Sequence, residues 1–491
     1  MKYYIGVDLG TSAVKLLLVD GAGKILNTVS KEYPLYFPQP GWSEQAPQDW
    51  WNAVSTGIRE LLRGFDASLV DALGCAGQMH GLVALDENDE VLRPAILWND
   101  GRTAEEVEYL NGTVGKARLS ALTANIAFAG FTAPKILWMR RHEPALFARI
   151  AKIMLPKDYI NYRLTGVHSC DYSDASGMLL LDVANKRWSR EMLELCGVAE
   201  AQMPRLYESW EVTGTLKPEI AEALGLPQTV KVVAGAGDNA AAAVGIGTVT
   251  NGACNVSVGT SGTVFISSDR FAADPNNALH AFAHAGGGWH LMGCMLSAAS
   301  CNKWFCEEIL RTKDFAAAQA EISDDMLGSN GVFFLPYLMG ERSPVNDTAA
   351  RGVFFGLSMD TTRAQMLLAV LEGVAFALRD SVEVARSLGL EIRESGLCGG
   401  GAKSPLWQKI LANVIGADLK LPESEEGPGY GGAMLAMVGG GAYRDVKQCA
   451  SALVRFRGTV PAEPTLQARY DEKYRIYRAL YPSLKDVFHA V

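Results

Sequence analysis

The first 35 residues contain short apolar runs separated by turn-forming residues, which is the pattern of a strand meander. Apolar residues dominate positions 3–7 and 14–19, and a Gly-Thr-Ser turn separates the two runs. A second turn, at residues 20–23, leads to a third run that begins at Ile25. We therefore predict three consecutive strands within residues 3–35.

The pattern alternates between helices and strands along the rest of the chain. Apolar residues recur at helical spacing over residues 47–62, and residues 104–225 are mainly helical by the same criterion. Further strands are predicted at residues 70–75, 230–234 and 395–398, and further helices at 132–141, 297–310, 362–388, 404–416 and 464–481. Strands that alternate with helices in this way indicate an α/β protein.

One stretch of the first meander is repeated in the middle of the chain. When residues 254–263 are laid over residues 5–14, Gly10-Thr11-Ser12 falls on Gly259-Thr260-Ser261. Glycine allows a ligand to approach the backbone, and successive N–H groups with two hydroxyls make a concave anion site. Two ordinary hairpins are the alternative, but a pair of turns that opens two halves of similar length favours phosphate binding from two sides. We place the domain boundary here, between residues 1–248 and 249–491.

Composition and charge restrict the class of function. The 491 residues are 48 % hydrophobic and 20 % charged, which is typical of a globular protein with room for two domains. The formal net charge of −9 argues against a nucleic-acid partner, because no basic field would attract a phosphate backbone. The start of the chain does not resemble a signal peptide and no apolar stretch is long enough to span a membrane, so we expect a cytoplasmic protein without a membrane partner. The nine scattered cysteines are accordingly expected to be reduced.

Polar residues directly follow two of the predicted strands, and ligands bind at such strand ends in α/β sheets. Met79 and His80 follow one strand, and Trp98 and Asp100 follow a short apolar run. A structural histidine and an Asn-Asp-Gly turn are the alternatives, and spacing alone favours both of these alternatives.

The best candidate for a catalytic base is Asp238, which follows the strand predicted at residues 230–234 together with Asn239. It would lie between a strand end and a helix N-terminus, where the helix dipole favours the charged carboxylate. Asp238 as a helix cap is the structural alternative. The glycines and alanines on both sides argue instead for room beside the carboxylate.

These parts together suit phosphoryl transfer, which needs a clamp on the phosphates, a metal ion to spread charge and a group that takes the acceptor's proton. Asp8, just before the first turn, is placed to hold magnesium directly or through water. Lys15 lies one strand further on and is a candidate for reaching phosphate. The triple glycine at residues 399–401, between a predicted strand and a predicted helix, is typical of a nucleotide cradle.

Motifs spread over nearly the whole chain resemble those of sugar kinases of the FGGY family, which belongs to the superfamily of actin, hexokinase and the heat-shock chaperone ATPases. These motifs are Asp8-Leu9-Gly10-Thr11-Ser12, Gly77-Gln78-Met79-His80-Gly81, Leu97-Trp98-Asn99-Asp100-Gly101-Arg102, Phe131-Thr132-Ala133-Pro134-Lys135, Pro156-Lys157-Asp158-Tyr159, Gly237-Asp238-Asn239-Ala240-Ala241, Leu335-Pro336-Tyr337 with Gly340-Glu341-Arg342, and Gly399-Gly400-Gly401-Ala402. The segment at residues 78–81 is most similar to the branch of the family that phosphorylates D-xylulose, because glycerol kinases of the family carry an Arg-Glu pair there.

The resemblance implies two ribonuclease-H-like domains of the actin/hexokinase type with a central cleft. It implies ATP and Mg²⁺ as cofactors and a ketose as the small-molecule partner, D-xylulose, which would be phosphorylated on its terminal hydroxyl to the 5-phosphate. Asp238 would be the general base and, with Asp8, would contact the metal. Sugar contacts are expected from Met79, His80, Asp238, Asn239, Trp98 and Asp100, and nucleotide contacts from Thr11, Ser12, Lys15, Gly259, Thr260, Gly400 and Ala402. A homodimer is one assembly that the resemblance leaves open.

One segment departs from the family's pattern. Residues 427–433 read Gly-Pro-Gly-Tyr-Gly-Gly-Ala, where Gly-Pro-Ala-x-Gly-Ala-Ala is expected. The bulky Tyr430 puts the packing and the nucleotide contacts of this segment in question.

Three other functions are compatible with parts of the sequence. A kinase for another ketose or polyol, such as ribulose or ribitol, would share most of the pocket, since few contacts separate epimeric sugars. An actin-like ATPase would use the same cleft without a sugar, but the small residues beside Asp238 and the lack of a peptide-binding module argue against it. A sugar-sensing regulator ranks last, because nothing resembles a basic DNA-binding extension.

Overall fold

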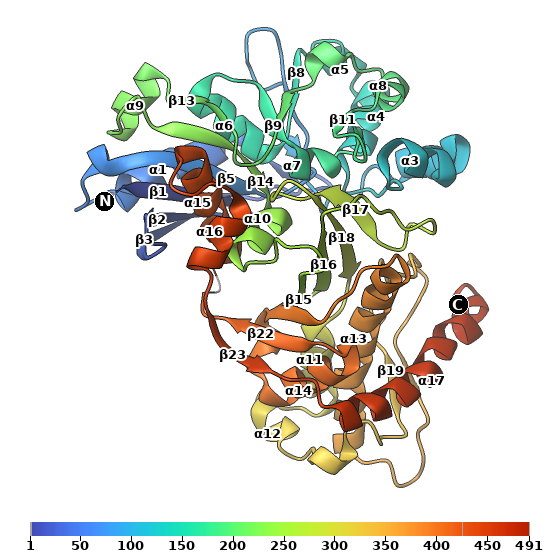
Figure 1. Cartoon of the computed structure of the whole chain (residues 1–491). Helices are drawn as coiled ribbons and strands as arrows, with labels where there is room; N and C mark the ends of the chain where they lie inside the picture. The colour runs from blue at the N-terminus through green and yellow to red at the C-terminus, as the bar shows by residue number, and fades with distance from the viewer. Residues whose placement is uncertain (1, 425, 491) are drawn as a thin grey trace.

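The computed structural model describes residues 2–424 and 426–490, and it contains one large sheet in each half of the chain (Figure 1). In spatial order, the first sheet consists of β13 (Val212–Thr215), β14 (Lys231–Gly237), β5 (Val70–Gly77), β1 (Tyr3–Leu9), β2 (Ala13–Asp20) and β3 (Ile25–Glu32). The second consists of β17 (His280–Ala283), β18 (Trp289–Met295), β16 (Gly262–Ser268), β15 (Cys254–Val258), β21 (Glu394–Cys398), β22 (Asp418–Pro422) and β23 (Phe456–Val460).

The two sheets repeat one topology. In the first sheet the antiparallel meander β1-β2-β3 continues on its other side through the parallel strands β5 and β14. In the second sheet the antiparallel strands β15, β16 and β18 continue through the parallel strands β21 and β22 in the same way. This repetition confirms the expected α/β fold with two related halves.

Helices and short strands surround the two sheets. The longer helices are α1 (Pro47–Leu61), α3 (Lys116–Thr123), α4 (Thr132–His142), α6 (Pro156–Thr165), α8 (Arg190–Cys196), α9 (Pro218–Leu224), α10 (Asp238–Gly245), α13 (Arg363–Ser387), α14 (Pro405–Ile415), α15 (Gly427–Gly440), α16 (Val446–Leu453) and α17 (Pro464–Phe488). The shorter helices are α2 (Ala104–Glu108), α5 (Pro144–Phe147), α7 (Tyr172–Ser176), α11 (Ala299–Trp304) and α12 (Phe315–Gln319). The short strands are β4 (Glu44–Gln45), β6 (Val83–Leu85), β7 (Ala95–Ile96), β8 (Lys152–Met154), β9 (Ser169–Asp171), β10 (Leu181–Asp182), β11 (Arg187–Trp188), β12 (Arg205–Tyr207), β19 (Phe333–Leu335) and β20 (Val353–Phe355).

The first sheet is covered on both faces, and side-chain alternation along β1 shows how. Ile5 and Val7 are fully buried in a cluster with Trp50 of α1. Tyr4 points to the opposite face and packs in a second cluster with residues of α15. Because successive strand residues point to opposite faces, Gly6 also lies on the α15 face. The first sheet is therefore a central layer between α1 and α15.

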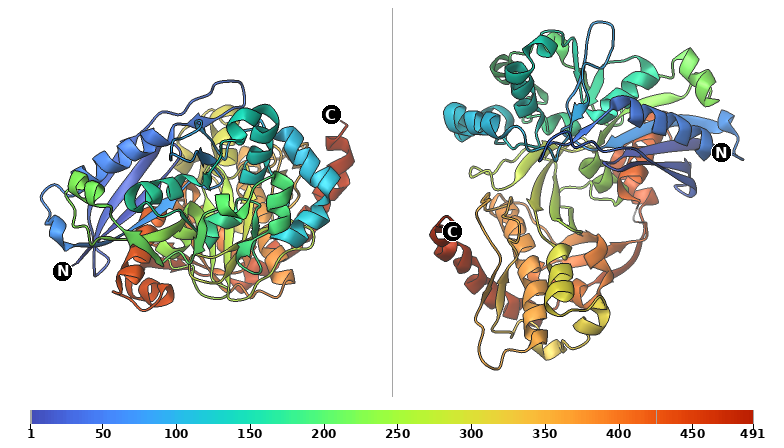
Figure 2. Two further views of the ribbon diagram at one scale, coloured as in Figure 1. Left: turned by 90° about the horizontal axis from the view of Figure 1, so that it is seen from above. Right: turned by 180° about the vertical axis from the view of Figure 1, so that it is seen from behind.

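Helix α15 comes from the C-terminal half of the chain but packs on the sheet of the N-terminal half, as Figures 1 and 2 show. This contact is made backbone to backbone. A Cβ atom added to Gly6 would lie 1.9 Å from the carbonyl oxygen of Gly429, and one added to Gly431 would lie 1.9 Å from that of Ala241 in α10. Only glycine permits such an approach, so the glycines of α15 belong to the packing of this helix.

Tyr430 points away from this glycine contact. Its side chain is 6 % exposed, and its hydroxyl donates a hydrogen bond of 2.9 Å to the carbonyl of Gly23 in the turn between β2 and β3. The unusual tyrosine thus fills space beside the first sheet and does not line the large pocket described below.

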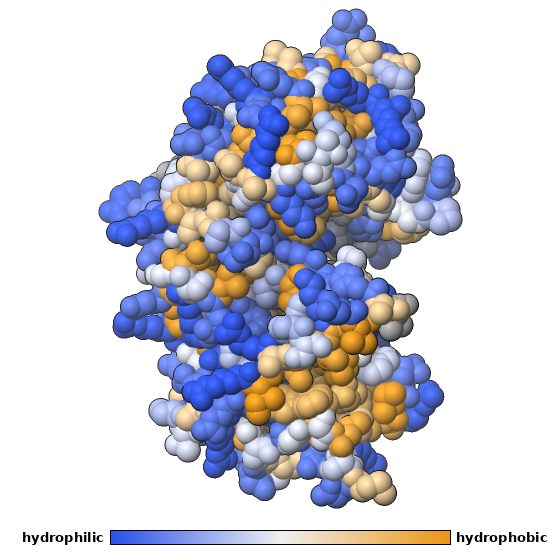
Figure 3. All heavy atoms as spheres, turned by 90° about the vertical axis from the view of Figure 1, so that its right-hand side faces the viewer, coloured by the Kyte–Doolittle hydropathy of each residue, from blue (hydrophilic) through white to orange (hydrophobic). Residues whose placement is uncertain are grey.

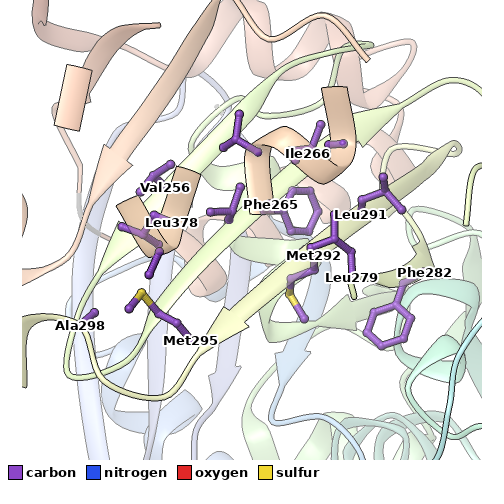
Figure 4. Close-up of a cluster of buried hydrophobic side chains, with 14 of the residues drawn as sticks. Val256, Phe265, Ile266, Leu279, Phe282, Leu291, Met292, Met295, Ala298 and Leu378 are labelled. Atoms are coloured by element: carbon purple, nitrogen blue, oxygen red, sulfur yellow. The ribbon is translucent and has the colours of Figure 1, made fainter. Parts of the chain in front are cut away.

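The second sheet packs against the long helix α13, as Figure 4 shows. Side chains of β15, β16 and β18, among them Val256, Phe265 and Met295, form one buried cluster with Leu378 of α13. A capping box begins this helix, because the Thr362 hydroxyl accepts the backbone N–H of Gln365 and the side-chain oxygen of Gln365 accepts the backbone N–H of Thr362.

Most of the predicted elements are present, with one region overestimated and one missed. The meander, α1, α4, α13, α14 and α17 lie where the periodicity placed them. Residues 104–225 are helical only in part, because short strands from β8 to β13 separate the helices. The glycine-rich residues 427–440 gave no helical signal, since glycine is a poor helix former, yet tertiary packing makes them helix α15.

The surface is mainly polar, and Figure 3 shows it hollowed between the upper and lower halves of the molecule. Within residues 2–424 and 426–490, no helix is both long and apolar enough to cross a membrane. All nine cysteines are free thiols, and seven of them are buried.

Candidate active site

A large pocket lies in the second domain at the ends of the neighbouring parallel strands β15 and β21. Its volume is about 1070 Å³. The second Gly-Thr-Ser turn contributes Gly259 and Thr260, and the triple-glycine turn contributes Gly400. The remaining lining comes from α11, α12 and the start of α14: Ala299, Ser300, Asn302, Lys303, Phe315, Ala316, Gln319, Ala320, Ile322, Gly401, Lys403, Ser404, Pro405, Leu406 and Trp407. Apolar walls, exposed backbone amides and two lysines suit a nucleotide with its phosphates.

The two turns of this pocket are held against each other by a close backbone contact. Gly399 has a φ of +90°, and a Cβ there would lie 2.7 Å from the carbonyl oxygen of Val258. Ala402 differs from the other predicted nucleotide contacts, because its side chain is buried and it does not line the pocket. Gly401 and Lys403 line the pocket beside it. Lys303 and Lys403 were missed by the sequence reasoning, since isolated lysines on helices carry no signal.

The first Gly-Thr-Ser turn joins β1 to β2 but does not line this pocket. Its backbone is closed by a hydrogen bond from the Gly10 amide to the carbonyl of Ala13, and Ser12 is exposed. The Thr11 hydroxyl accepts a hydrogen bond of 2.9 Å from the indole of Trp98. Trp98 is 45 % exposed, so this predicted sugar residue stands at the surface beside the first turn.

Asp8 and Lys15 face each other across the β1–β2 pair, on the side of the sheet that α15 covers. The Lys15 ammonium pairs with the carboxylate of Glu426, just before α15. Burial and, after it, the nearby negative charge of Asp238 together raise the pKa of Asp8 to about 7. A predicted metal ligand thus lies close enough to the predicted base for the two carboxylates to repel each other.

Asp238 is the first residue of α10, immediately after β14. One of its oxygens, Oδ1, accepts hydrogen bonds from the backbone N–H of Asn239 at 2.7 Å and from its side-chain amide at 3.0 Å. Burial raises the pKa of Asp238 to about 6, and the two bonds from Asn239 oppose that rise. Oδ2 accepts no hydrogen bond from any described residue, so one face of the carboxylate is available to a ligand.

Met79 and His80 follow β5, the strand beside β14. The imidazole Nδ1 lies 2.8 Å from the carbonyl of Gly177, so Nδ1 carries the proton and Nε2 is left as an acceptor. Burial, aided by the charge of Lys135, lowers the pKa of His80 to about 3, which keeps the ring neutral. The Met79 side chain packs against Gly237, where a Cβ would lie 2.9 Å from it. The structure therefore brings this segment directly beside the base.

Asp100 does not present its carboxylate to a ligand. It is 2 % exposed, and both oxygens are occupied: they accept from the Ser43 amide at 2.6 Å and from the Arg102 guanidinium at 2.7 and 2.9 Å. The guanidinium also lies 3.7 Å from the ring centroid of Trp42. The expectation that Asp100 binds sugar is not supported by these contacts, because its charge serves to hold the loop that carries Trp98.

A buried ionic network lies beneath the base, and the sequence reasoning missed it. The ammonium of Lys157 lies 2.6 Å from Asp158, 2.9 Å from Asp171 and 3.6 Å from Asp174, and all four side chains are fully buried. Asp171 is also the N-cap of α7, where its side chain accepts the backbone N–H of Ser173. A sequence does not show whether a capping aspartate is buried. The network becomes visible only in the structure, where Asp171 pairs with Lys157.

This network reaches the backbone of the base. Asp171 accepts hydrogen bonds from the hydroxyls of Ser173 at 2.5 Å and Ser209 at 2.8 Å. The Ser173 oxygen in turn accepts the N–H of Gly237, the residue before Asp238, at 3.2 Å. Gly237 is thus held between Ser173 on one side and Met79 on the other.

No group of three or more His, Cys, Asp or Glu side chains converges as a metal cage among the described residues. Asp8 and Asp238 nevertheless fit the requirements of Mg²⁺, which binds through one or two carboxylates together with substrate phosphates. The mutual repulsion that raises the pKa of Asp8 would be relieved by a divalent cation.

Comparison with known proteins identifies the family of this chain. The profile of the FGGY family of carbohydrate kinases, N-terminal domain, matches residues 3–245, and that of its C-terminal domain matches residues 254–440. The chain belongs to the FGGY family of carbohydrate kinases and is a phosphotransferase that uses ATP.

Its relatives share nearly their whole length with it. The xylulose kinase of Escherichia coli (strain K12) is 43 % identical over 98 % of this chain and 99 % of its own. The xylulose kinase of Klebsiella pneumoniae is 45 % identical over 89 % of each chain. The crystal structure of a xyloylose kinase from Brucella ovis is similar with a TM-score of 0.94 and 41 % identity, over 99 % of this chain and 100 % of that one.

We expect Lys157→Met to lower the free energy of unfolding at pH 7 by about 3–5 kcal/mol, because it leaves three buried carboxylates without their cation. Urea denaturation measures the loss. The loss should shrink towards pH 5, where protonation can neutralise the carboxylates. Lys2→Met, which removes an exposed ion pair with Asp71, is the control and should cost less than about 1 kcal/mol. Equal losses in the two variants would contradict this role of the network.

Proposed function

We propose that this kinase transfers the γ-phosphoryl group of magnesium-ATP to the terminal hydroxyl of D-xylulose, giving D-xylulose 5-phosphate. The observation that carries the proposal is the position of the Asp238 carboxylate. It has one oxygen bound by Asn239 and the other available, and it lies directly beside the Met79–His80 segment. The names of full-length relatives supply the sugar.

In this mechanism Asp238 acts as the general base. Oδ2 would take the proton of the sugar hydroxyl while that oxygen attacks the γ-phosphorus and ADP leaves. The two hydrogen bonds to Oδ1 fix the carboxylate in one orientation, so that Oδ2 faces the substrate. A pKa of about 6 keeps the group ionised at neutral pH while leaving it basic enough to accept a proton.

The sugar would be bound mainly by the first domain. Neutral His80 can accept a hydrogen bond from a sugar hydroxyl through Nε2, and Asn239 can offer its remaining amide proton. Met79 packs behind the carboxylate and can contact the carbon chain. Trp98, on the surface beside Thr11, can cover the sugar from the solvent side.

The nucleotide would occupy the pocket of the second domain, with phosphates over Gly259, Thr260 and Gly400. Asp8 and Asp238 would hold Mg²⁺, which supplies charge neutralisation to the phosphates when bound. Lys15 is engaged with Glu426 and would have to leave that partner to reach a phosphate.

Other ketoses or polyols remain the alternative substrates, and the Met79–His80 segment packed beside the base argues against an ATPase without a sugar. The homodimer, the cytoplasmic location and the domain limits at residues 248 and 249 stay predictions. ATP turnover measured with D-xylulose, D-ribulose, ribitol and no acceptor tests the proposal, and turnover independent of any sugar would contradict it.

Asp238→Asn should keep the fold and lower kcat by about 10²- to 10⁴-fold, because the amide cannot take the hydroxyl proton. Steady-state ADP release measures the rate, and thermal melting checks the fold. Asp445→Asn is the control, because Asp445 is the N-cap of α16 and accepts the backbone N–H of Gln448 far from the proposed base, so this variant should turn over normally. Near-normal turnover in a folded Asp238→Asn variant would remove this residue from the role of base.

Activity should depend on pH and on magnesium together. We expect kcat/KM for ATP to fall as the pH drops from 7 to 5, because Asp8 and Asp238, with pKa values of about 7 and about 6, take up protons in this range. A tenfold increase in free Mg²⁺ should move the fall to lower pH, since a cation favours the ionised carboxylates. His80 stays neutral throughout and adds no step. A pH profile that does not respond to magnesium would contradict the assignment of these two carboxylates to the metal.

A further inference from the structure

The loop between β19 and β20 is a rigid platform that presents one arginine. The backbones of Glu341 and Asp347 exchange two hydrogen bonds of 2.8 and 2.9 Å, which close the loop. The amide of Ser343 donates to the carbonyl of Cys294, and this bond of 2.9 Å fixes the loop to β18. The buried carboxylate of Glu341 accepts the amides of Leu296 and Arg342 at 2.8 and 2.7 Å. The backbone at Arg342 is therefore held in place, and the arginine side chain starts from a fixed position.

The guanidinium of Arg342 has no carboxylate partner among the described residues. Its side chain lies beside the thiol of Cys294 in β18, and Cζ lies 5.3 Å from the ring centroid of Phe128. Arg93 and Arg102, the other arginines packed against aromatic rings in this region, are each paired with carboxylates. A half-buried arginine without a carboxylate partner keeps donors available to a ligand.

A row of aromatic rings connects this arginine with the Met79–His80 segment. Phe128 packs against Phe131 with their centroids 5.5 Å apart, and Phe131 stacks on the imidazole of His80 at 4.7 Å. The charge of Arg342 also contributes, after burial and Lys135, to the low pKa of His80. Arg342 thus lies on the side of His80 where this row begins, and it is carried by the second domain.

We infer that Arg342 binds the keto end of the sugar from the second domain. This inference rests on the proposed function. The terminal hydroxyl that receives the phosphoryl group must lie at Asp238, so the rest of a pentulose extends past His80 towards the aromatic row. The end that reaches Arg342 then carries the C2 carbonyl and the C1 hydroxyl. A guanidinium has donors and no acceptor, which matches a carbonyl oxygen and a neighbouring hydroxyl.

Two consequences follow for specificity. A carbonyl oxygen accepts from arginine without having to orient a proton of its own, so Arg342 would favour a ketose over the corresponding pentitol. Because Arg342 and Asp238 belong to different domains, a bound ketose would also contact both sides of the cleft, whereas a polyol would be held mainly by the first domain.

The test compares Arg342→Met, which keeps the packing of the side-chain stem on Phe128, with Arg342→Lys, which keeps the charge but loses the planar fork. Each variant is assayed with D-xylulose and with xylitol, at varied sugar and varied ATP. Arg342→Met should raise KM for D-xylulose at least tenfold and change KM for ATP less than twofold. The ratio of kcat/KM for D-xylulose to that for xylitol should fall at least fivefold, and Arg342→Lys should be intermediate.

Arg351→Met is the matched control, because Arg351 is exposed near the end of the same loop and contacts only backbone carbonyls. It should match the unchanged enzyme in KM for D-xylulose and in the ratio of kcat/KM for D-xylulose to that for xylitol. If the unchanged enzyme phosphorylates no ketose, the proposed function fails. If it does, the inference is overturned when Arg342→Met keeps its KM for D-xylulose, when the losses are equal for ketose and pentitol, or when KM for ATP rises instead.

Discussion

The arrangement of this enzyme depends on a backbone-to-backbone contact between α15 and the first sheet. Glycines on both sides leave no Cβ at the points of closest approach, so that the helix lies against β1, β5 and α10 at distances no other residue permits there. The contact brings a segment from the C-terminal half of the chain against the strands that carry Asp8 and the helix that begins with Asp238. The positions of both carboxylates are therefore set by a helix that begins 189 residues after Asp238 and 419 residues after Asp8 in the chain.

Close packing also accounts for the electrostatics of the site. Asp8 lies on the α15 face of β1, where the helix excludes water, and burial is the largest cause of its raised pKa. Asp238 is half-buried as well. Asn239 donates two hydrogen bonds to it, and these offset part of the free-energy cost of burying the carboxylate charge. Beneath them, Lys157 and Asp171 fix the Gly237 backbone through Ser173. Such a buried network adds little net stability compared with an apolar core, so its effect lies in fixing the geometry of Gly237.

Much of this structure could be predicted from the sequence, and the failures have physical reasons. The repeated Gly-Thr-Ser turns predicted two related halves, because a local motif carries its own turn chemistry. The position of Asp238 between a strand and a helix was predicted for the same reason. Helix α15 was missed because its stability comes from contacts with strands far away in the chain and not from the propensity of its residues. The partners of Asp100 could not be predicted, because a sequence cannot show that Arg102 and Ser43 donate hydrogen bonds to both of its oxygens.

The two domains contribute opposite charges to the reaction. The first domain presents Asp8 and Asp238, and the second lines its pocket with Lys303, Lys403 and the amides of two glycine turns. ATP bound to the second domain would bring its negative phosphates towards the two carboxylates of the first. That approach is unfavourable without a cation between them, because like charges in a water-poor cleft repel strongly. Under the proposed mechanism, closure of the cleft over both substrates would therefore be coupled to the binding of a divalent cation, and the cleft would resist closing on a nucleotide that arrives without a metal.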